Sequence, residues 1–214
     1  MVVIPGINCQ DFKCVSDYWD KAAGLGVRAV QIDVADGEFA PVRTWNNPSE
    51  LAGLIAKNPQ MEAEIHLMAE NPEPVFEKWL DAGVKRLVIH IESAGNLESI
   101  REIISARGAG IIWGIKSGTD VRKLEGLLKN EAGDSVQFLD VSPGFSGQSF
   151  NAEVIDAINF LRERHSDLDI RVDGGINPET AKMAKEAGAN AAIAVSYIWK
   201  SASPAEAYQE LIRV

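Results

Sequence analysis

The chain has 214 residues, of which 46% are hydrophobic and 24% are charged, and its formal net charge is −10. This length suits one large core and lies within the range of single-domain α/β barrels. The acidic balance argues against nucleic-acid partners, because phosphate backbones are bound by basic protein faces. The apolar N-terminus lacks a charged leader region and no apolar run approaches membrane length, so we expect a cytoplasmic protein with no membrane partner.

The chain contains two cysteines, Cys9 and Cys14, which lie close together near its start. They have no second pair to complete a metal cluster. We therefore expect two free thiols in a reducing compartment.

Apolar, strand-like runs alternate with amphipathic helical stretches from end to end. The strands are expected at residues 2–5, 29–34, 63–68, 86–91, 110–115, 135–141, 170–173 and 191–195. Most are continuously apolar, as strands covered on both faces should be. Helical stripes recur between them, as in Phe12, Val15, Trp19, Ala22 and Ala23, in Val121, Leu124, Leu127 and Leu128, and in Val154, Ile155, Ile158 and Leu161.

Glycine and proline mark the ends of several of these helices. Gly26, Gly83 and Gly188 are expected to end helices in the left-handed conformation. The last helix is expected to begin at Pro204, with Ser203 and Glu206 forming a capping box. Since no linker interrupts the alternation, we predict a single (β/α)8 TIM-barrel domain over residues 1–214.

In such a barrel the functional groups follow the strands, so the strand exits are the candidate site. Asp33 lies at the end of the second strand and Asp173 at the end of the seventh. Two opposed carboxylates could take a proton from one face of a substrate and return one to the other. His66 on the third strand shares their position in the ring, and the three residue types would suit a divalent metal. For His90 we expect a packing or hydrogen-bonding role.

The loops after the last three strands are rich in small residues, which let backbone N–H groups approach an anion closely. Phosphate sites in barrels are commonly built after strands 7 and 8. We therefore expect a phosphorylated substrate, bound by Gly144, Phe145, Ser146, Gly147, Gly174, Gly175 and Ser196.

Four segments at these strand exits resemble the ribulose-phosphate 3-epimerase family, and the likeness runs through nearly the whole chain. They are residues 31–41 (QIDVADGEFAP), 65–73 (IHLMAENPE), 142–150 (SPGFSGQSF) and 172–177 (VDGGIN). The resemblance implies interconversion of D-ribulose 5-phosphate and D-xylulose 5-phosphate through an enediolate, with Asp33 and Asp173 exchanging the proton. It implies a divalent metal (Zn, Fe, Mn or Co) on Asp33, His66 and Asp173. It also implies Met68 among the pocket residues, and a homo-oligomer.

The chain departs from the family pattern at the site. Gln31 replaces a metal-binding histidine, and a glutamine amide is a weaker, neutral ligand, so we expect the metal to be weakly held or absent. The other departures are Gly6 for serine, Ala35 and Leu139 for methionine, Lys116-Ser117 for asparagine-proline and Val195 for glycine. Lys116 could replace part of the metal's charge, or reach the substrate phosphate or solvent.

Two alternatives to the epimerase stay open. One is a related aldolase- or decarboxylase-type enzyme acting on a ketose phosphate with Lys116 as its main group. The other is a non-catalytic barrel that binds a phosphorylated metabolite or a partner protein. Substitution at several pocket positions favours this last reading and retention of both aspartates disfavours it, because fold alone does not decide function.

Overall fold

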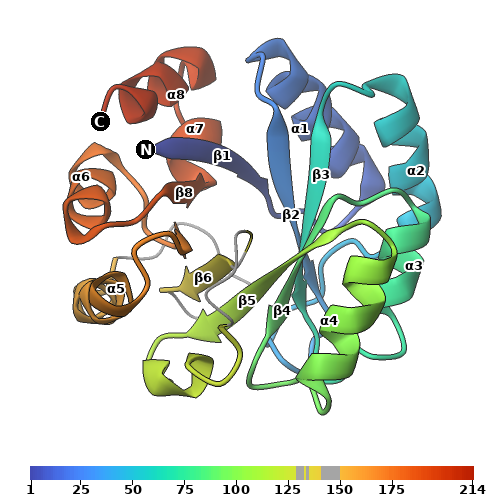
Figure 1. Cartoon of the computed structure of the whole chain (residues 1–214). Coiled ribbons are helices and arrows are strands. Elements are labelled where there is room, and N and C mark those ends of the chain that lie inside the picture. The colour runs from blue at the N-terminus through green and yellow to red at the C-terminus, as the bar shows by residue number, and fades with distance from the viewer. Residues whose placement is uncertain (129–132, 134, 141–149) are drawn as a thin grey trace.

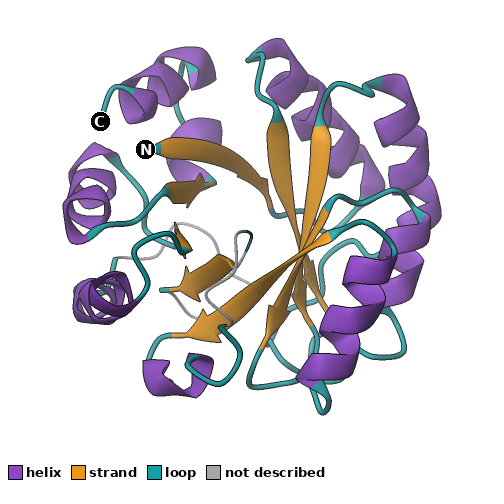
Figure 2. Cartoon of the chain, viewed as in Figure 1, coloured by secondary structure: helices purple, strands orange, loops and turns teal. Residues whose placement is uncertain are grey.

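The chain folds into a closed barrel of eight parallel strands, β1 to β8, paired in sequence order. The computed structural model describes residues 1–128, 133, 135–140 and 150–214. The helices surround the strands on the outside (Figures 1 and 2). The elements are β1 (Val2–Ile7), α1 (Phe12–Gly24), β2 (Ala29–Ala35), α2 (Pro48–Lys57), β3 (Glu62–Met68), α3 (Phe76–Asp81), β4 (Arg86–His90), α4 (Leu97–Ala106), β5 (Gly110–Lys116), the 3-10 helix η1 (Val121–Leu124), β6 (Ser135–Leu139), α5 (Glu153–Arg164), β7 (Asp169–Asp173), α6 (Pro178–Ala187), β8 (Ala191–Ala194), α7 (Ser196–Trp199) and α8 (Pro204–Ile212).

The TIM-barrel prediction is confirmed, and each predicted strand is present with ends close to those expected. One predicted helix is much shorter than its pattern indicated. Val121 to Leu124 form only the short η1, with Leu124 and Leu128 buried as the pattern required. Gly126 interrupts the stripe, and glycine is a poor helix former. Within the described residues, no helix is long and apolar enough to cross a membrane.

Glycines end three helices as predicted, since Gly26, Gly83 and Gly188 have φ angles of 71°, 93° and 110°. Pro204 opens α8 after Ser203, but the Ser203 side chain makes no capping hydrogen bond, so the predicted capping box is wrong. The Ser201 hydroxyl contacts the Ser203 backbone instead, accepting from its N–H and donating to its C=O.

The expectation of free thiols is also wrong, because Cys9 and Cys14 form a disulfide. Cys9 follows β1 and Cys14 lies in the first turn of α1, and the tight β1–α1 connection brings their Cα atoms to 5.8 Å. Spacing in the sequence did not reveal that turn. The bridge ties the segment that follows β1 to the start of α1.

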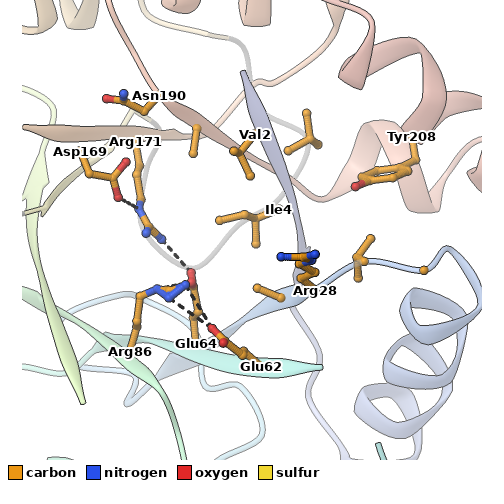
Figure 3. Close-up of a pocket in the computed structure, with 15 residues that line it drawn as sticks. Val2, Ile4, Arg28, Glu62, Glu64, Arg86, Asp169, Arg171, Asn190 and Tyr208 are labelled. Carbon is orange, nitrogen blue, oxygen red and sulfur yellow. Dashed lines mark hydrogen bonds and ion pairs between the residues drawn. The ribbon is translucent and has the colours of Figure 1, made fainter. Parts of the chain in front are cut away.

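The N-terminal end of the barrel holds an ion-pair network (Figure 3). The carboxylate of Glu64 is fully buried and lies 2.9 Å from Arg171 and 2.8 Å from Arg86. Arg171 also contacts Asp169 at 2.7 Å. These residues line a pocket of about 540 Å³. This end of a barrel usually serves stability, and the network compensates charges that would otherwise be costly to bury.

Candidate active site

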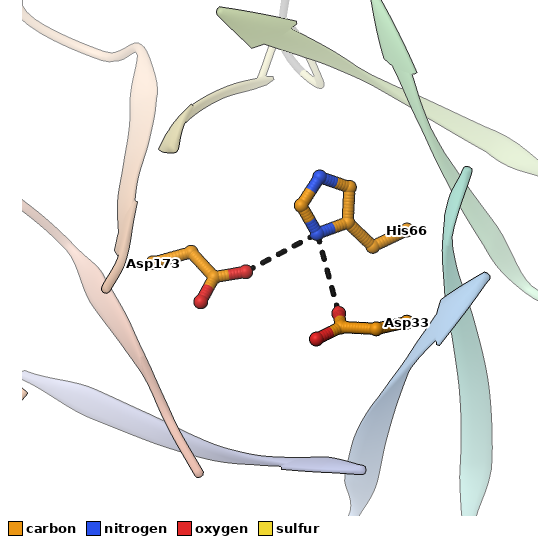
Figure 4. A group of neighbouring side chains, drawn as sticks. All are labelled: Asp33, His66 and Asp173. Carbon is orange, nitrogen blue, oxygen red and sulfur yellow. Dashed lines mark ion pairs between the residues drawn. The ribbon is translucent and has the colours of Figure 1, made fainter. Parts of the chain in front are cut away.

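Three buried side chains converge inside the C-terminal end of the barrel. Asp33 comes from β2, His66 from β3 and Asp173 from the end of β7, and one ligand-type atom of each lies within 4.8 Å of the others. Nδ1 of His66 is 3.3 Å from Asp33 Oδ1 and 3.2 Å from Asp173 Oδ2. Figure 4 shows both carboxylates pointing at this ring nitrogen from different strands. Strand register makes this meeting possible, because Asp33 pairs directly with His66.

Gln31 completes the cluster. It lies two residues before Asp33 in β2, so its side chain is on the same face of the strand. Its Nε2 lies 2.7 Å from Asp173 Oδ2, 3.2 Å from Asp33 Oδ1 and 3.3 Å from His66 Nδ1. Its amide oxygen, Oε1, is buried and has no hydrogen-bond partner among the described residues. The amide therefore contacts all three of the other groups through one end and leaves the other end unsatisfied.

The ligand-type atoms of Asp33, His66 and Asp173 lie close enough together to hold a metal ion. In a tetrahedral zinc site with bonds of about 2.0–2.1 Å, ligand atoms lie roughly 3.4 Å apart. The five separations given above run from 2.7 to 3.3 Å. Turning the Gln31 amide over would exchange its N and O, which places the unsatisfied oxygen among the other ligand atoms as a fourth donor.

The pKa values of two residues in the cluster, His66 and Asp173, are raised above their ordinary values. Burial by itself would lower the pKa of His66, but hydrogen bonds to Asp173 and Asp33 raise it to about 9. The pKa of Asp173 is raised above its ordinary value because the carboxyl is buried, and the nearby charge of Asp33 adds to the shift while His66 opposes it. Two carboxylates facing one another thus demand positive charge, and a proton on His66 supplies it where no cation does.

Comparisons with known proteins point to one family. The model of the "Ribulose-phosphate 3 epimerase family" matches residues 2–199. The cytoplasmic isoform of ribulose-phosphate 3-epimerase from Oryza sativa subsp. japonica is 32% identical, over 98% of this chain and 92% of its own length. The chain belongs to the ribulose-phosphate 3-epimerase family. A ribulose-phosphate 3-epimerase from Chlamydia muridarum is 31% identical, over 95% of this chain and 90% of its own.

Solved structures support the fold of this epimerase-family chain. A crystal structure of 3-hexulose-6-phosphate synthase superposes with a TM-score of 0.73 at 17% identity, covering 99% of this chain and 98% of the other. At that identity the likeness shows the barrel alone. The family resemblance read from the four sequence segments is confirmed by the family model and the curated relatives.

Two further amides hold the carboxylates of this epimerase-family site. Asn8, just after β1, donates to Asp33 Oδ2 at 3.0 Å, and Gln137 on β6 donates to Asp173 Oδ2 at 3.1 Å. Sequence reasoning missed Gln137. Its signal was a polar residue inside an apolar strand, two positions before Leu139, which pairs in register with Asp173.

A small apolar group lies at the C-terminal ends of β2, β3 and β6. Met68 and Leu139 pack there with Ala35, Phe39 and Ala40. Lys116, the last residue of β5, places its ammonium over the Phe39 ring at 4.2 Å from the centroid. Met68 is buried in this apolar group, and its contact with a substrate stays a prediction, while Lys116 lies on an aromatic face.

Only part of the predicted phosphate site lies in the described residues. Gly174 and Gly175 follow β7 with φ angles of 127° and 61°, and Ser196 is the first residue of α7, after β8. A Cβ at Gly175 would lie 2.5 Å from the backbone N of Phe150, so packing alone already requires glycine there. Gly144, Phe145, Ser146 and Gly147 lie outside the described residues. Phosphate binding therefore stays a prediction.

His90 takes the hydrogen-bonding role expected of it. Its Nε2 lies 2.8 Å from Nε2 of His66, and its Nδ1 lies 3.2 Å from Glu92. Burial lowers the pKa of His90 to about 4, so its ring is neutral at pH 7. Burial would raise the pKa of Glu92, but hydrogen bonds with His90, Thr119 and the Lys116 backbone hold it at about 2.

Proposed function

We propose that the chain interconverts D-ribulose 5-phosphate and D-xylulose 5-phosphate by moving the proton on the carbon next to the ketone. The observation that carries this proposal is the convergence of Asp33 and Asp173, from strands far apart in the sequence, on one buried point of the barrel mouth. Membership of the epimerase family supports the reaction type.

Inversion at carbon requires proton removal from one face and proton delivery to the other. One carboxylate acts as the general base and the other, protonated, as the general acid, and the roles exchange in the reverse direction. Asp33 and Asp173 suit these roles because they reach the cluster from β2 and β7, two strands that are not neighbours in the barrel. Asn8, Gln31 and Gln137 hold the carboxylates in position through their amide N–H groups.

A carbon acid next to a ketone is too weak for a free carboxylate, so the enediolate must be stabilised electrostatically. A divalent cation held by Asp33, His66, Asp173 and the amide oxygen of Gln31 would act as the Lewis acid for the enediolate oxygens. We expect weak occupancy, because a neutral amide donates less strongly than imidazole. In the chain itself, the N–H groups of Gln31 and His66 offset the charge of the two carboxylates.

The alternatives are less well supported. An aldolase- or decarboxylase-type reaction through Lys116 requires the amine at the reacting carbon, whereas the ammonium lies on the Phe39 ring. A non-catalytic barrel gives no reason for the buried, mutually repelling carboxylates. The phosphate site, the homo-oligomeric state and the cytoplasmic location stay predictions, the last supported by the name of the rice relative.

Interconversion of the two pentulose phosphates by purified protein tests the proposal. Asp33→Asn and Asp173→Asn should each abolish turnover, because removing either carboxylate removes one of two required proton transfers. Asp169→Asn is the matched control, since Asp169 lies at the opposite end of the same strand as Asp173 and pairs with Arg171. Wild-type turnover by either folded site variant would refute the roles assigned here.

A further inference from the structure

A hydrogen-bonded chain runs from Glu92 through His90 to His66, and the proton-transfer reaction proposed above does not use its first two members. Oε2 of Glu92 lies 3.2 Å from Nδ1 of His90, and Nε2 of His90 lies 2.8 Å from Nε2 of His66. Both imidazoles are buried. The remaining ring nitrogen of His66, Nδ1, faces Asp33 and Asp173.

The surrounding residues are shaped to hold this chain. The other oxygen of Glu92 accepts hydrogen bonds from the Lys116 backbone N–H at 2.8 Å and the Thr119 hydroxyl at 2.6 Å, which fixes the carboxylate from the side of β5. Gly114 pairs in register with His90, and a Cβ there would lie 3.0 Å from the His90 ring. The Phe39 ring covers His90 at a centroid distance of 4.7 Å.

The contacts determine where each proton lies. Glu92 receives two donors on Oε1 and acts as an acceptor, so the facing nitrogen of His90, Nδ1, carries a proton. With a cation on Nδ1 of His66, the single proton of that imidazole lies on Nε2. Nε2 of His90 lies 2.8 Å away and accepts the hydrogen bond from it, while Nδ1 of His90 donates to Glu92.

We propose that Glu92 and His90 are positioning residues that keep a proton on Nε2 of His66, so that Nδ1 is the nitrogen that faces Asp33 and Asp173 and the one that gives up its proton when a cation binds. For a bound cation this leaves Nδ1 as the ligand atom, in the arrangement by which outer hydrogen bonds orient metal-binding histidines. Any effect of Glu92 or His90 on turnover rests on the proposed function, whereas the proton positions on the two histidines do not.

Glu92→Gln is the informative change. A glutamine amide can donate to Nδ1 of His90, which allows His90 to carry its proton on Nε2 and to donate to His66. Nε2 of His66 would then have to accept, and its proton would move to Nδ1, where it blocks a ligand lone pair. Loss of such outer contacts typically weakens metal binding roughly 10- to 100-fold.

Two measurements test the proposal, and neither reads turnover, so its failure is distinguishable from failure of the epimerase proposal. Long-range 1H–15N NMR of histidine-labelled protein should show a proton on Nδ1 of His90, both without metal and with Zn²⁺, and the single proton of His66 on Nε2 when Zn²⁺ is bound. Titration with Co²⁺, followed by absorbance, should show the loss of affinity in Glu92→Gln.

Glu73→Gln is the control for the titration, because Glu73 accepts hydrogen bonds from the Gly95 and Asn96 backbone and not from the histidines. Its Co²⁺ affinity should match wild type. A wild-type His90 with its proton on Nε2, or wild-type Co²⁺ affinity in a folded Glu92→Gln protein, would overturn the proposal. If Glu92→Gln does not fold, or if no cation binds, the His90 proton position in the wild type decides.

Discussion

The side chain of Val195 occupies the space that a side chain at Gly6 would need. A Cβ at Gly6 would lie 2.5 Å from Cγ2 of Val195 and 3.1 Å from Cγ2 of Ile193. By resemblance to the family, serine is expected at position 6 and glycine at position 195. The two departures therefore compensate one another, because Val195, just after β8, fills the space that a serine side chain at position 6 of β1 would occupy.

We expect Gly6→Ser alone to lower the free energy of unfolding by about 1–3 kcal/mol, because it overpacks against Val195. In a Val195→Gly background the same change should cost much less, because the clashing methyl is gone. Urea unfolding of the two single variants and the double variant gives the coupling free energy. Purely additive effects would show that the two positions do not share this space.

Gln31→His should raise metal occupancy toward one ion per chain, because an imidazole nitrogen is a stronger ligand than an amide oxygen. Metal analysis of protein purified without chelators, together with Zn²⁺ titration calorimetry, measures the change. Gln137→His is the control, since Gln137 is also a buried glutamine that donates to Asp173 but lies outside the four-residue cluster. A wild type with full, tight occupancy would show that Gln31 is already an adequate ligand.

Lys116→Met should leave proton exchange largely intact and lower the free energy of unfolding by about 0.5–2 kcal/mol. That is the range for a cation–π contact between a half-buried lysine and a buried ring, and methionine keeps an apolar stem against Phe39. Borohydride added with substrate should trap no adduct on the wild-type protein. A trapped adduct, or turnover abolished by Lys116→Met, would instead support chemistry through the amine.

Cys14→Ser should lower the free energy of unfolding by about 2 kcal/mol, the loop-closure value for so short a loop. Wild-type protein in reductant should lose a similar amount, and the variant should not respond to reductant. Denaturant unfolding with and without dithiothreitol measures both effects. An equal wild-type stability under the two conditions would argue that the Cys9–Cys14 bridge does not stabilise the fold.

Much of the fold could be predicted because each element carries a local signal. Continuous apolar runs indicated strands buried on both faces, and glycines such as Gly188 indicated where helices end in the left-handed conformation. The errors arose where local signals compete with tertiary contacts. The Val121 stripe indicated a full helix although Gly126 interrupts it, and Ser203 had the sequence of a capping residue although Ser201 binds its backbone.

The site was predictable only in part, because its partners come from different strands. Strand-exit reasoning brought Asp33, His66 and Asp173 together, since parallel strands of a barrel end on one rim. It could not reveal that Gln137 supports Asp173, or that His90 bonds to His66, because both contacts depend on strand register and barrel geometry. The Cys9–Cys14 bridge depends on a turn whose shape the spacing does not specify.

The position of deuterium taken up from D2O by D-ribulose 5-phosphate tests the central claim most directly. If Asp33 and Asp173 transfer the proton on the carbon next to the ketone, NMR should show deuterium at C3 of the xylulose 5-phosphate formed, and Asp173→Asn should show none. Deuterium at C1 alone would contradict proton transfer to and from C3 by these two carboxylates. So would the absence of deuterium with folded wild-type protein supplied with Zn²⁺, Fe²⁺, Mn²⁺ or Co²⁺.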